Sequence, residues 1–537
     1  MTRLNAPLRH GGGWSQSGWL SRIAVIASGA IAAFGFAPFH LWGVTLLSLT
    51  LLFIRLVGVS RRDRPARAGF WTGLLFGLGW FSASCFWIAS AFIERGPEFI
   101  PMIPPLVGGL AIVLSLFWGV AGAVVARQGR RQGAIWRKAM LFVAAFTLAE
   151  LARGHVLSGF PWNMAAYALE PGGAISQSTS LFGVYGLTMV IYVIAALIGG
   201  AVLTRDWRPA LGVGVTLAAL FSFGAHRLAH ATQDIHPGVV LRLVAVPFRQ
   251  SEKINPTTSL DIVNSYLAVS VEPGIEDVTH LVWPEGAVNG LVTEDDGLLR
   301  YLGGLLSQRT STPPVWLMNS LRQEVVLDRR GVPKTRYYNS AVAITFDPLG
   351  NPAIAGSNDK KKLVPFGEFI PGGELVERIG ARLVSTAIAS ISSAPEKLVS
   401  EFPGLPPISP QICYEVIFPG LTPGSSEGSP APQAILNQSN DAWFGSTVGP
   451  AQHAAIARYR AIEEGLPLIR SAANGVSGVF DSYGRAERVL SGKRVGYLDA
   501  VLPVSIGQTV EITVVNAVLA LLNLCLILLG VTDLRRF

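Results

Sequence analysis

Three short segments of the chain each combine a polar, reactive side chain with the end of a β-type run. Glu285 stands in HLVWPEGAV, Lys360 in NDKKKLVPFGEFIP and Cys413 in QICYEVIFPG. Open sheets present their catalytic groups at strand ends, so the three side chains are candidates for one site. A thiol with an ordinary pKa of about 8.5 is mostly protonated at neutral pH, and it needs a base or a cation beside it to act as a nucleophile.

Each residue taken alone has an ordinary explanation. A cysteine such as Cys413 is often a buried structural thiol. Glu285 in WPEG would also suit a turn, and three consecutive lysines usually form a solvated basic run. The hypothesis of catalysis therefore depends on the three segments together.

The composition shows that much of the chain does not face water. Half of the 537 residues are apolar and only 15% are charged, against about 25% in a soluble domain. Runs long enough to cross a bilayer, about 20 apolar residues, occur at 19–38, 42–58, 70–91, 105–126, 138–154, 183–204, 209–228 and 512–531. The sequence therefore predicts a polytopic α-helical membrane domain of eight transmembrane helices, seven before a long polar region and one after it.

The polar region between the last two spans alternates β-type runs with helical stretches. This pattern favours an α/β sandwich of layered sheets and helices. We therefore divide the chain into a seven-helix membrane domain at 1–229, a catalytic domain at 230–510, and a C-terminal helix with its tail at 511–537.

The distribution of arginine and lysine predicts the orientation in the membrane. Basic residues gather at the N-terminus, in the even-numbered loops and in the tail: Arg3, Arg9, Arg61, Arg62, Arg64, Arg67, Arg127, Arg130, Arg131, Arg137, Lys138, Arg205, Arg208, Arg535 and Arg536. Such loops face the cytoplasm, so the polar region is expected on the opposite face, the periplasm of a bacterium. Because these arginines are not interleaved with aromatic residues on one domain, we expect no nucleic-acid partner.

The segment GFPWNMAAYALEP at 159–171 follows the fifth span outside the membrane. Its aromatic residues Phe160, Trp162 and Tyr167 fit two explanations. They suit a belt at the membrane interface, and they equally suit a lipid-facing or substrate-facing loop beneath the polar domain.

The motifs WPE, K-x-x-LVPFGE and CYE, in this order, resemble the nitrilase superfamily, whose Glu-Lys-Cys triad acts on carbonyl carbons. The pattern of spans, with GFAPFHLW, GFPWNMAAY, NQSNDAWFG and RAIEEGLPLIRSAANGVSG, resembles the apolipoprotein N-acyltransferase family over nearly the whole chain. That resemblance implies a nitrilase-like αββα fold for the catalytic domain. It also sets the register of the lysine, because Lys360 stands eight residues before Glu368.

The resemblance implies an inner-membrane enzyme that moves an acyl chain from a phospholipid, through a thioester on Cys413, to the α-amine of a diacylated apolipoprotein. Glu285 would act as the base, and Lys360 would stabilise the thiolate and the oxyanion. Glu368 is expected to orient Lys360 or the incoming amine. Tyr414 and Glu415 are expected to shape the pocket, and the enzyme is expected to work as a monomer among membrane lipids.

No metal or cofactor is expected, because the eight histidines show no ligand spacing and the chain has no glycine-rich phosphate loop. Two other functions remain open: a membrane-tethered amidohydrolase that gives its acyl group to water, and a binding module with a vestigial triad. Eight spans argue against the hydrolase, since a soluble substrate needs at most one anchor. The intact triad argues against the binding module.

Overall fold

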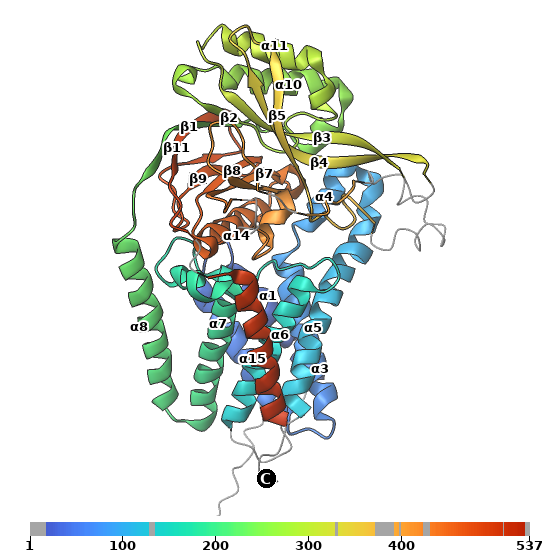
Figure 1. The fold of residues 1–537 in the computed structure, drawn as a ribbon. Coiled ribbons are helices and arrows are strands. Elements are labelled where there is room, and N and C mark those ends of the chain that lie inside the picture. The colour runs from blue at the N-terminus through green and yellow to red at the C-terminus, as the bar shows by residue number, and fades with distance from the viewer. Residues whose placement is uncertain are drawn as a thin grey trace, which may run out of the picture.

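The computed structural model describes residues 18–127, 135–327, 331–370, 391–396, 399–422, 430–507 and 510–531. Figure 1 shows long helices at one end and, at the other, two β-sheets with helices of their own. The turn between α7 and α8 lies at the end away from the sheets, as does the C-terminal end of α15. Six of the basic residues behind the predicted orientation lie outside the described residues: Arg3, Arg9, Arg130, Arg131, Arg535 and Arg536.

The helical part is formed by nine helices of the described chain: α1 (Gly18–Ile31), α2 (Trp42–Val59), α3 (Pro65–Ser84), α4 (Ile88–Arg95), α5 (Gly109–Arg127), α6 (Ile135–His155), α7 (Thr179–Thr204), α8 (Arg208–Ala229) and α15 (Ile512–Val531). Among the described residues, six helical segments are long and apolar enough to cross a membrane. The pair α3 and α4, bent by 49°, makes a possible seventh. The predicted count of eight is therefore not reached on length and composition, and α6 is the helix that falls short.

The shortfall of α6 comes from its charged residues Arg137, Lys138, Glu150 and Arg153, of which the last two pair with each other inside the bundle. Glu150 and Arg153, on one face of α6, form an ion pair of 2.5 Å, and both side chains are completely buried. Trp118 Nε1 of α5 also donates a hydrogen bond to Glu150 Oε1 at 2.7 Å. A buried charge is tolerated when it is paired and hydrogen-bonded, so α6 sits among apolar helices despite its composition.

Glycines let α3 and α5 approach each other closely. Gly69 and Gly73, four residues apart on α3, face Gly122 and Trp118 on α5. A Cβ atom at Gly73 would lie 2.1 Å from the carbonyl oxygen of Trp118. Small residues at this spacing are the usual means by which membrane helices bring their backbones together.

We predict that Gly73→Ala destabilises the helical part, because the added methyl group meets a backbone carbonyl that cannot move aside. The expected cost is about 1–3 kcal/mol, read as a lower melting temperature of the detergent-purified chain. Gly58→Ala is the matched control, since no heavy atom beyond the neighbouring residues and the nearby backbone of its own helix lies within 4 Å of a Cβ there. Equal melting temperatures for the two variants would contradict the close contact.

The polar region forms two sheets. The first has the strand order β11-β1-β2-β3-β4-β5 and the second the order β10-β9-β8-β7-β6. The strands are β1 (Ile235–Ala245), β2 (His280–Val282), β3 (Val315–Leu327), β4 (Pro333–Phe346), β5 (Pro352–Asp359), β6 (Ile408–Ile412), β7 (Ala434–Asn440), β8 (Leu468–Ala473), β9 (Val476–Phe480), β10 (Val489–Ser491) and β11 (Gly496–Pro503). The main helices of the polar region are α9 (Gln250–Ile254), α10 (Ser259–Ser270), α11 (Asp296–Ser307) and α14 (Gly449–Glu464).

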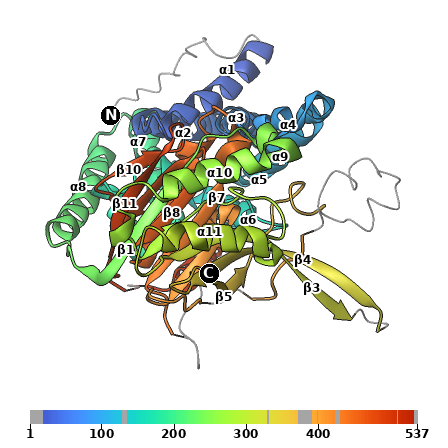
Figure 2. The ribbon, with the colours of Figure 1, turned by 90° about the horizontal axis from the view of Figure 1, so that it is seen from above.

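These elements stack as helix, sheet, sheet and helix. Leu241 and Leu317 of the first sheet meet Leu436 and Ile469 of the second in one buried core. Helices α10 and α11 lie across the outer face of the first sheet (Figure 2). Helix α14 covers the second sheet and shares a core with the long helices, through residues such as Tyr459. The α/β sandwich predicted from the alternating runs is therefore observed.

The segment 159–171 lies beneath α14. Trp162 and Tyr167 are 1% and 2% exposed, and Trp162 Nε1 donates a hydrogen bond to Gln452 Oε1 of α14 at 2.9 Å. Tyr459 of α14 in turn donates to the carbonyl oxygens of Ala166 and Leu169. For Trp162 and Tyr167, the explanation as a belt at the membrane interface is therefore wrong, because both side chains are covered by protein, whereas Phe160 is half-buried.

Candidate active site

The three predicted catalytic residues all lie just beyond strand ends. Lys360 directly follows β5 and Cys413 directly follows β6, while Glu285 stands three residues after β2. Strands β2 and β5 belong to the first sheet and β6 to the second. The site is therefore assembled across the two sheets, from segments far apart in the sequence.

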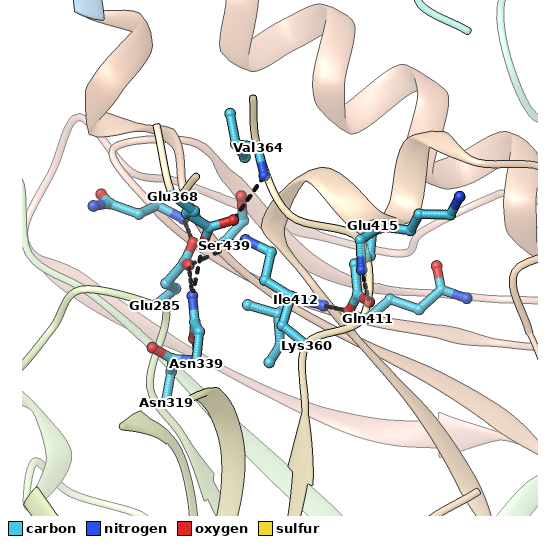
Figure 3. Close-up of polar contacts among 12 residues, drawn as sticks. Glu285, Asn319, Asn339, Lys360, Val364, Glu368, Gln411, Ile412, Glu415 and Ser439 are labelled. Carbon is cyan, nitrogen blue, oxygen red and sulfur yellow. Dashed lines mark hydrogen bonds and ion pairs between the residues drawn. The ribbon is translucent and has the colours of Figure 1, made fainter. Parts of the chain in front are cut away.

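The Lys360 ammonium lies between two carboxylates (Figure 3). Its Nζ is 2.8 Å from Glu368 Oε1 and 3.8 Å from Glu285 Oε1, and the side chain is completely buried. Burial by itself lowers the pKa of Lys360, but the charges of Glu368, Glu285 and Cys413 outweigh it, so the pKa is raised above its ordinary value. Lys360 is therefore a permanent cation within the electrostatic reach of the thiol.

Both oxygens of Glu285 are held by neighbouring groups. Asn339 Nδ2 donates to Glu285 Oε1 at 2.8 Å, and the backbone N–H of Asn440 donates to Oε2 at 2.9 Å. Asn339 Nδ2 also lies 3.1 Å from Glu368 Oε1. The side chain of Asn339 is itself held by Asn319, whose Nδ2 donates to Asn339 Oδ1 at 2.6 Å. The Glu285 carboxylate therefore has little freedom to rotate, which fits the predicted role of a general base.

Cys413 begins a single turn of helix, Cys413–Ile417, with φ of +49°. A positive φ is uncommon for residues other than glycine and costs of order 1–3 kcal/mol. The residue is partly exposed. Burial of the sulfur raises the pKa of the Cys413 thiol, as do the charges of Glu285 and Asp441, and Lys360 opposes this rise. The resting residue is therefore a neutral thiol that needs a base before it can attack.

Glu415 holds the turn of Cys413 against the turn of Lys360. Its Oε2 accepts a hydrogen bond from the backbone N–H of Ile412 at 2.8 Å, next to the thiol. Its Oε1 accepts from the N–H groups of Lys361 and Lys362 at 2.8 and 3.1 Å, next to the ammonium. One buried carboxylate thus fixes the segments of Cys413 and Lys360 relative to each other (Figure 3).

Tyr414 connects the site to the helical part. Its hydroxyl donates to the carbonyl oxygen of Gly159 at 2.8 Å, in the segment 159–171. Nearby, Phe444 packs edge-on against Trp87 with ring centroids 4.5 Å apart, and Trp87 packs against Trp162 at 4.6 Å. The turn of Cys413 therefore lies directly above the connections between the long helices.

A second set of buried charges lies at the end of β7. His453 Nδ1 and Arg470 Nη2 contact the two oxygens of Asp441 at 2.9 and 2.7 Å. Burial favours the neutral acid, but Arg470 and His453 lower the pKa of Asp441 to about 2. His453 Nδ1 is therefore paired with Asp441, which gives this histidine a structural role.

Lys253 of α9 is a second buried lysine close to Glu285. Its Nζ donates to Asn440 Oδ1 at 3.1 Å. Burial lowers the pKa of Lys253 to about 7, although Glu285 and Asp441 act in the opposite direction. The side chain therefore steadies Asn440, whose backbone N–H holds Glu285.

The supporting roles of Asn339, Asn440 and Lys253 were not predicted from the sequence. Asn440 lies in the motif NQSNDAWFG, so the family motif was the available signal for it. Asn339 lies within the β-type run RYYNSAVAITF, where an asparagine interrupts residues typical of strands. Within the described residues, no group of three or more His, Cys, Asp or Glu side chains is arranged to hold a metal ion.

The layered fold and the Glu-Lys-Cys site define a member of the nitrilase superfamily. A carbon-nitrogen hydrolase family model matches residues 321–497, which include Lys360 and Cys413 and begin after Glu285. A model of the apolipoprotein N-acyltransferase N-terminal domain matches residues 28–197. The two matches thus cover most of the helical part and most of the sandwich.

Relatives match along almost the whole chain. An apolipoprotein N-acyltransferase of Rhodopseudomonas palustris is 34% identical over 536 residues, covering 95% of each chain. That of Bradyrhizobium diazoefficiens is 35% identical over 530 residues, covering 96% of this chain and 95% of its own. The chain belongs to the apolipoprotein N-acyltransferase family, so the predicted resemblance is confirmed. Together with its long apolar helices, this membership makes it a membrane protein.

We predict that Lys360→Met slows alkylation of Cys413 by iodoacetamide roughly tenfold or more, because loss of the cation raises the thiol pKa further. In the unchanged chain the rate should still be rising above about pH 9, since the thiol pKa already lies above its ordinary value. Mass spectrometry of the Cys413 peptide measures both rates.

Lys361→Met is the matched control, because Lys361 contributes its backbone N–H to the site. A Lys360→Met chain that reacts as fast as this control would contradict the electrostatic role of the ammonium.

Proposed function

We propose that this chain is a phospholipid:apolipoprotein N-acyltransferase. It would take an acyl chain from a phospholipid, hold it as a thioester on Cys413, and pass it to the α-amino group of the N-terminal diacylglyceryl-cysteine of a lipoprotein. The single observation that carries the proposal is the buried Lys360 ammonium, coupled electrostatically to both Glu285 and Cys413. Membership of the family supplies the two lipid substrates.

In the first half-reaction, the sulfur of Cys413 attacks the ester carbonyl carbon of the phospholipid. Glu285 accepts the thiol proton, and Lys360 stabilises the negative charge that develops on the carbonyl oxygen. When the tetrahedral intermediate collapses, the carbon–oxygen bond breaks and Glu285 returns the proton to the leaving lysophospholipid. Glu368 and Asn339 act by positioning, since they contact the Lys360 ammonium and the Glu285 carboxylate.

In the second half-reaction, the free amine of the lipoprotein attacks the thioester. Glu285 accepts a proton from the amine, an amide bond forms, and the Cys413 thiolate leaves and is protonated again. Amines attack thioesters more readily than oxygen esters, so the thioester intermediate makes transfer of the acyl chain to the amine faster. Both substrates are lipids, and the contacts from Tyr414 and α14 to the segment 159–171 support their entry from the membrane.

We further propose the arrangement of the chain in the bacterial inner membrane. Residues 1–229 would form the membrane domain, 230–510 the catalytic domain and 511–537 the last helix with its tail. Counting α6 as a span and α3 with α4 as one span gives eight crossings, and an even count returns both termini to the same side. The catalytic domain would then face the periplasm, and the enzyme would act as a monomer.

We predict that the detergent-purified chain, incubated with acyl-labelled phospholipid, forms a labelled adduct that hydroxylamine releases. Cys413→Ala should abolish the adduct, and Glu285→Gln should slow its formation about 100-fold or more, because a general base contributes that much. The exposed substitution Lys493→Met is the control. Absence of an adduct on the unchanged chain, or its survival in Cys413→Ala, would exclude the mechanism. Transfer of the label to water rather than to a diacylated lipopeptide would identify a hydrolase.

The orientation is tested with single introduced cysteines in a chain carrying Cys85→Ser, Cys413→Ala and Cys525→Ser. We expect a membrane-impermeant maleimide to label Lys493→Cys, an exposed position of the sandwich, in intact spheroplasts. Arg205→Cys, exposed between α7 and α8, should react only after the membrane is broken. The reverse pattern would place the catalytic domain in the cytoplasm.

A further inference from the structure

A cavity of about 810 Å³ lies between α1, α2 and α3, far from Cys413. Its walls are the start of α1, the end of α2 and the start of α3. The other end of α3 reaches the segment beneath α14, where Asn163 Nδ2 donates to the carbonyl oxygen of Ser84. Because α3 has 20 residues and is therefore about 30 Å long, the cavity and the triad lie on opposite sides of the helical part.

The cavity exists because α1 and α3 touch at one level and separate below it. Gly29 of α1 lies against the backbone of Phe76 in α3, and Gly79 of α3 lies against the backbone of Ile26 in α1. Toward their N-terminal ends the two helices no longer touch in this way, and the space between them opens. The end of α2 closes the third side.

The charged lining of the cavity is strongly basic. Its ionisable members are five arginines and one aspartate: Arg22, Arg55, Arg62, Arg64, Arg67 and Asp63. Arg55 Nη2 donates to Ser21 Oγ, while Arg55 Nε is buried and has no hydrogen-bond partner. Helix α3 begins at Pro65, and the free N–H groups and positive dipole end at its N-terminus add to the positive potential of the arginines. Such a surface suits a phosphate group, which accepts several hydrogen bonds from guanidinium groups.

The remaining lining is apolar and runs along the helices. Val25 and Val59 belong to helices long enough to cross a membrane, and Trp71 and Leu75 continue the wall along α3. A soluble phosphate would use the arginines alone. A diacyl phospholipid would use both surfaces, with its phosphate among the arginines and its acyl chains along the helices.

We propose that this cavity binds the headgroup of an anionic phospholipid from the leaflet on the arginine-rich side of the membrane. This lipid would be separate from the acyl donor, because it lies at the end of the helices opposite to Cys413. Basic pockets between membrane helices commonly hold anionic lipids. The bound lipid would bridge α1, α2 and α3 where their own contacts end.

The test is native mass spectrometry of the full-length chain with dioleoyl phosphatidylglycerol, dioleoyl phosphatidylcholine and inorganic phosphate. We expect phosphatidylglycerol to bind about tenfold more tightly than phosphatidylcholine, because only the former carries a net negative charge. Excess inorganic phosphate should not displace it. Equal binding of the two lipids would overturn the proposal. Displacement by phosphate, with the same dependence on the arginines, would identify a soluble anion as the ligand and overturn it equally.

Two double variants, each replacing a pair of exposed loop arginines, distinguish binding at this cavity from attraction to the general positive charge of the surface. Arg62→Gln with Arg64→Gln should remove the preference for phosphatidylglycerol, whereas Arg205→Gln with Arg208→Gln, outside the cavity, should retain it. Both pairs should still form the acyl adduct, so this inference fails independently of the proposed function. An equal loss of preference in the two double variants would show that no defined site exists. The rise in melting temperature on adding phosphatidylglycerol gives a second readout for each variant.

Discussion

The Lys360 ammonium is completely removed from water, and this constraint governs the whole site. An isolated buried charge is very costly, so Lys360 is tolerated only because Glu368 and Glu285 lie beside it. Those carboxylates are held in turn, Glu285 by Asn339 and Asn440 and Glu368 by the backbone N–H of Val364 and by Asn339. Removing Lys360 or one of the two carboxylates would leave a buried charge without its partner. Because all three charged groups are held in this way, their arrangement is rigid before any substrate binds.

This rigidity fits the chemistry proposed for the Cys413 thiol. The pKa of Cys413 is raised, so the sulfur rests in its neutral form. In the proposed mechanism, a fixed base and a fixed cation would allow the thiolate to form only as the substrate carbonyl is attacked, with no reorganisation of the protein. Glu415 fixes Cys413 relative to Lys360, because its carboxylate accepts hydrogen bonds from three backbone N–H groups next to these two residues.

The sandwich is fastened to the helices by polar contacts as well as by apolar packing. Glu463 of α14 accepts a hydrogen bond from the backbone N–H of Val184 at 2.6 Å. That N–H follows the break in α7 at Phe182 and Gly183, so a carboxylate of the sandwich caps the second half of a long helix. With the contacts of Trp162 and Tyr414, this makes the active site and the helical bundle parts of one structure.

The family, the α/β class of the polar region and most of the long helices could be predicted from the sequence alone. These depend on local signals: ordered motifs around Glu285, Lys360 and Cys413, alternating β-type runs, and long apolar runs. Only the tertiary structure revealed the roles of Asn339 and Lys253, and that Trp162 lies under protein. It also showed how α6 accommodates its charges and where arginines line an open cavity between α1, α2 and α3. Those features depend on contacts between residues distant in the sequence, which leave no periodic or compositional signal.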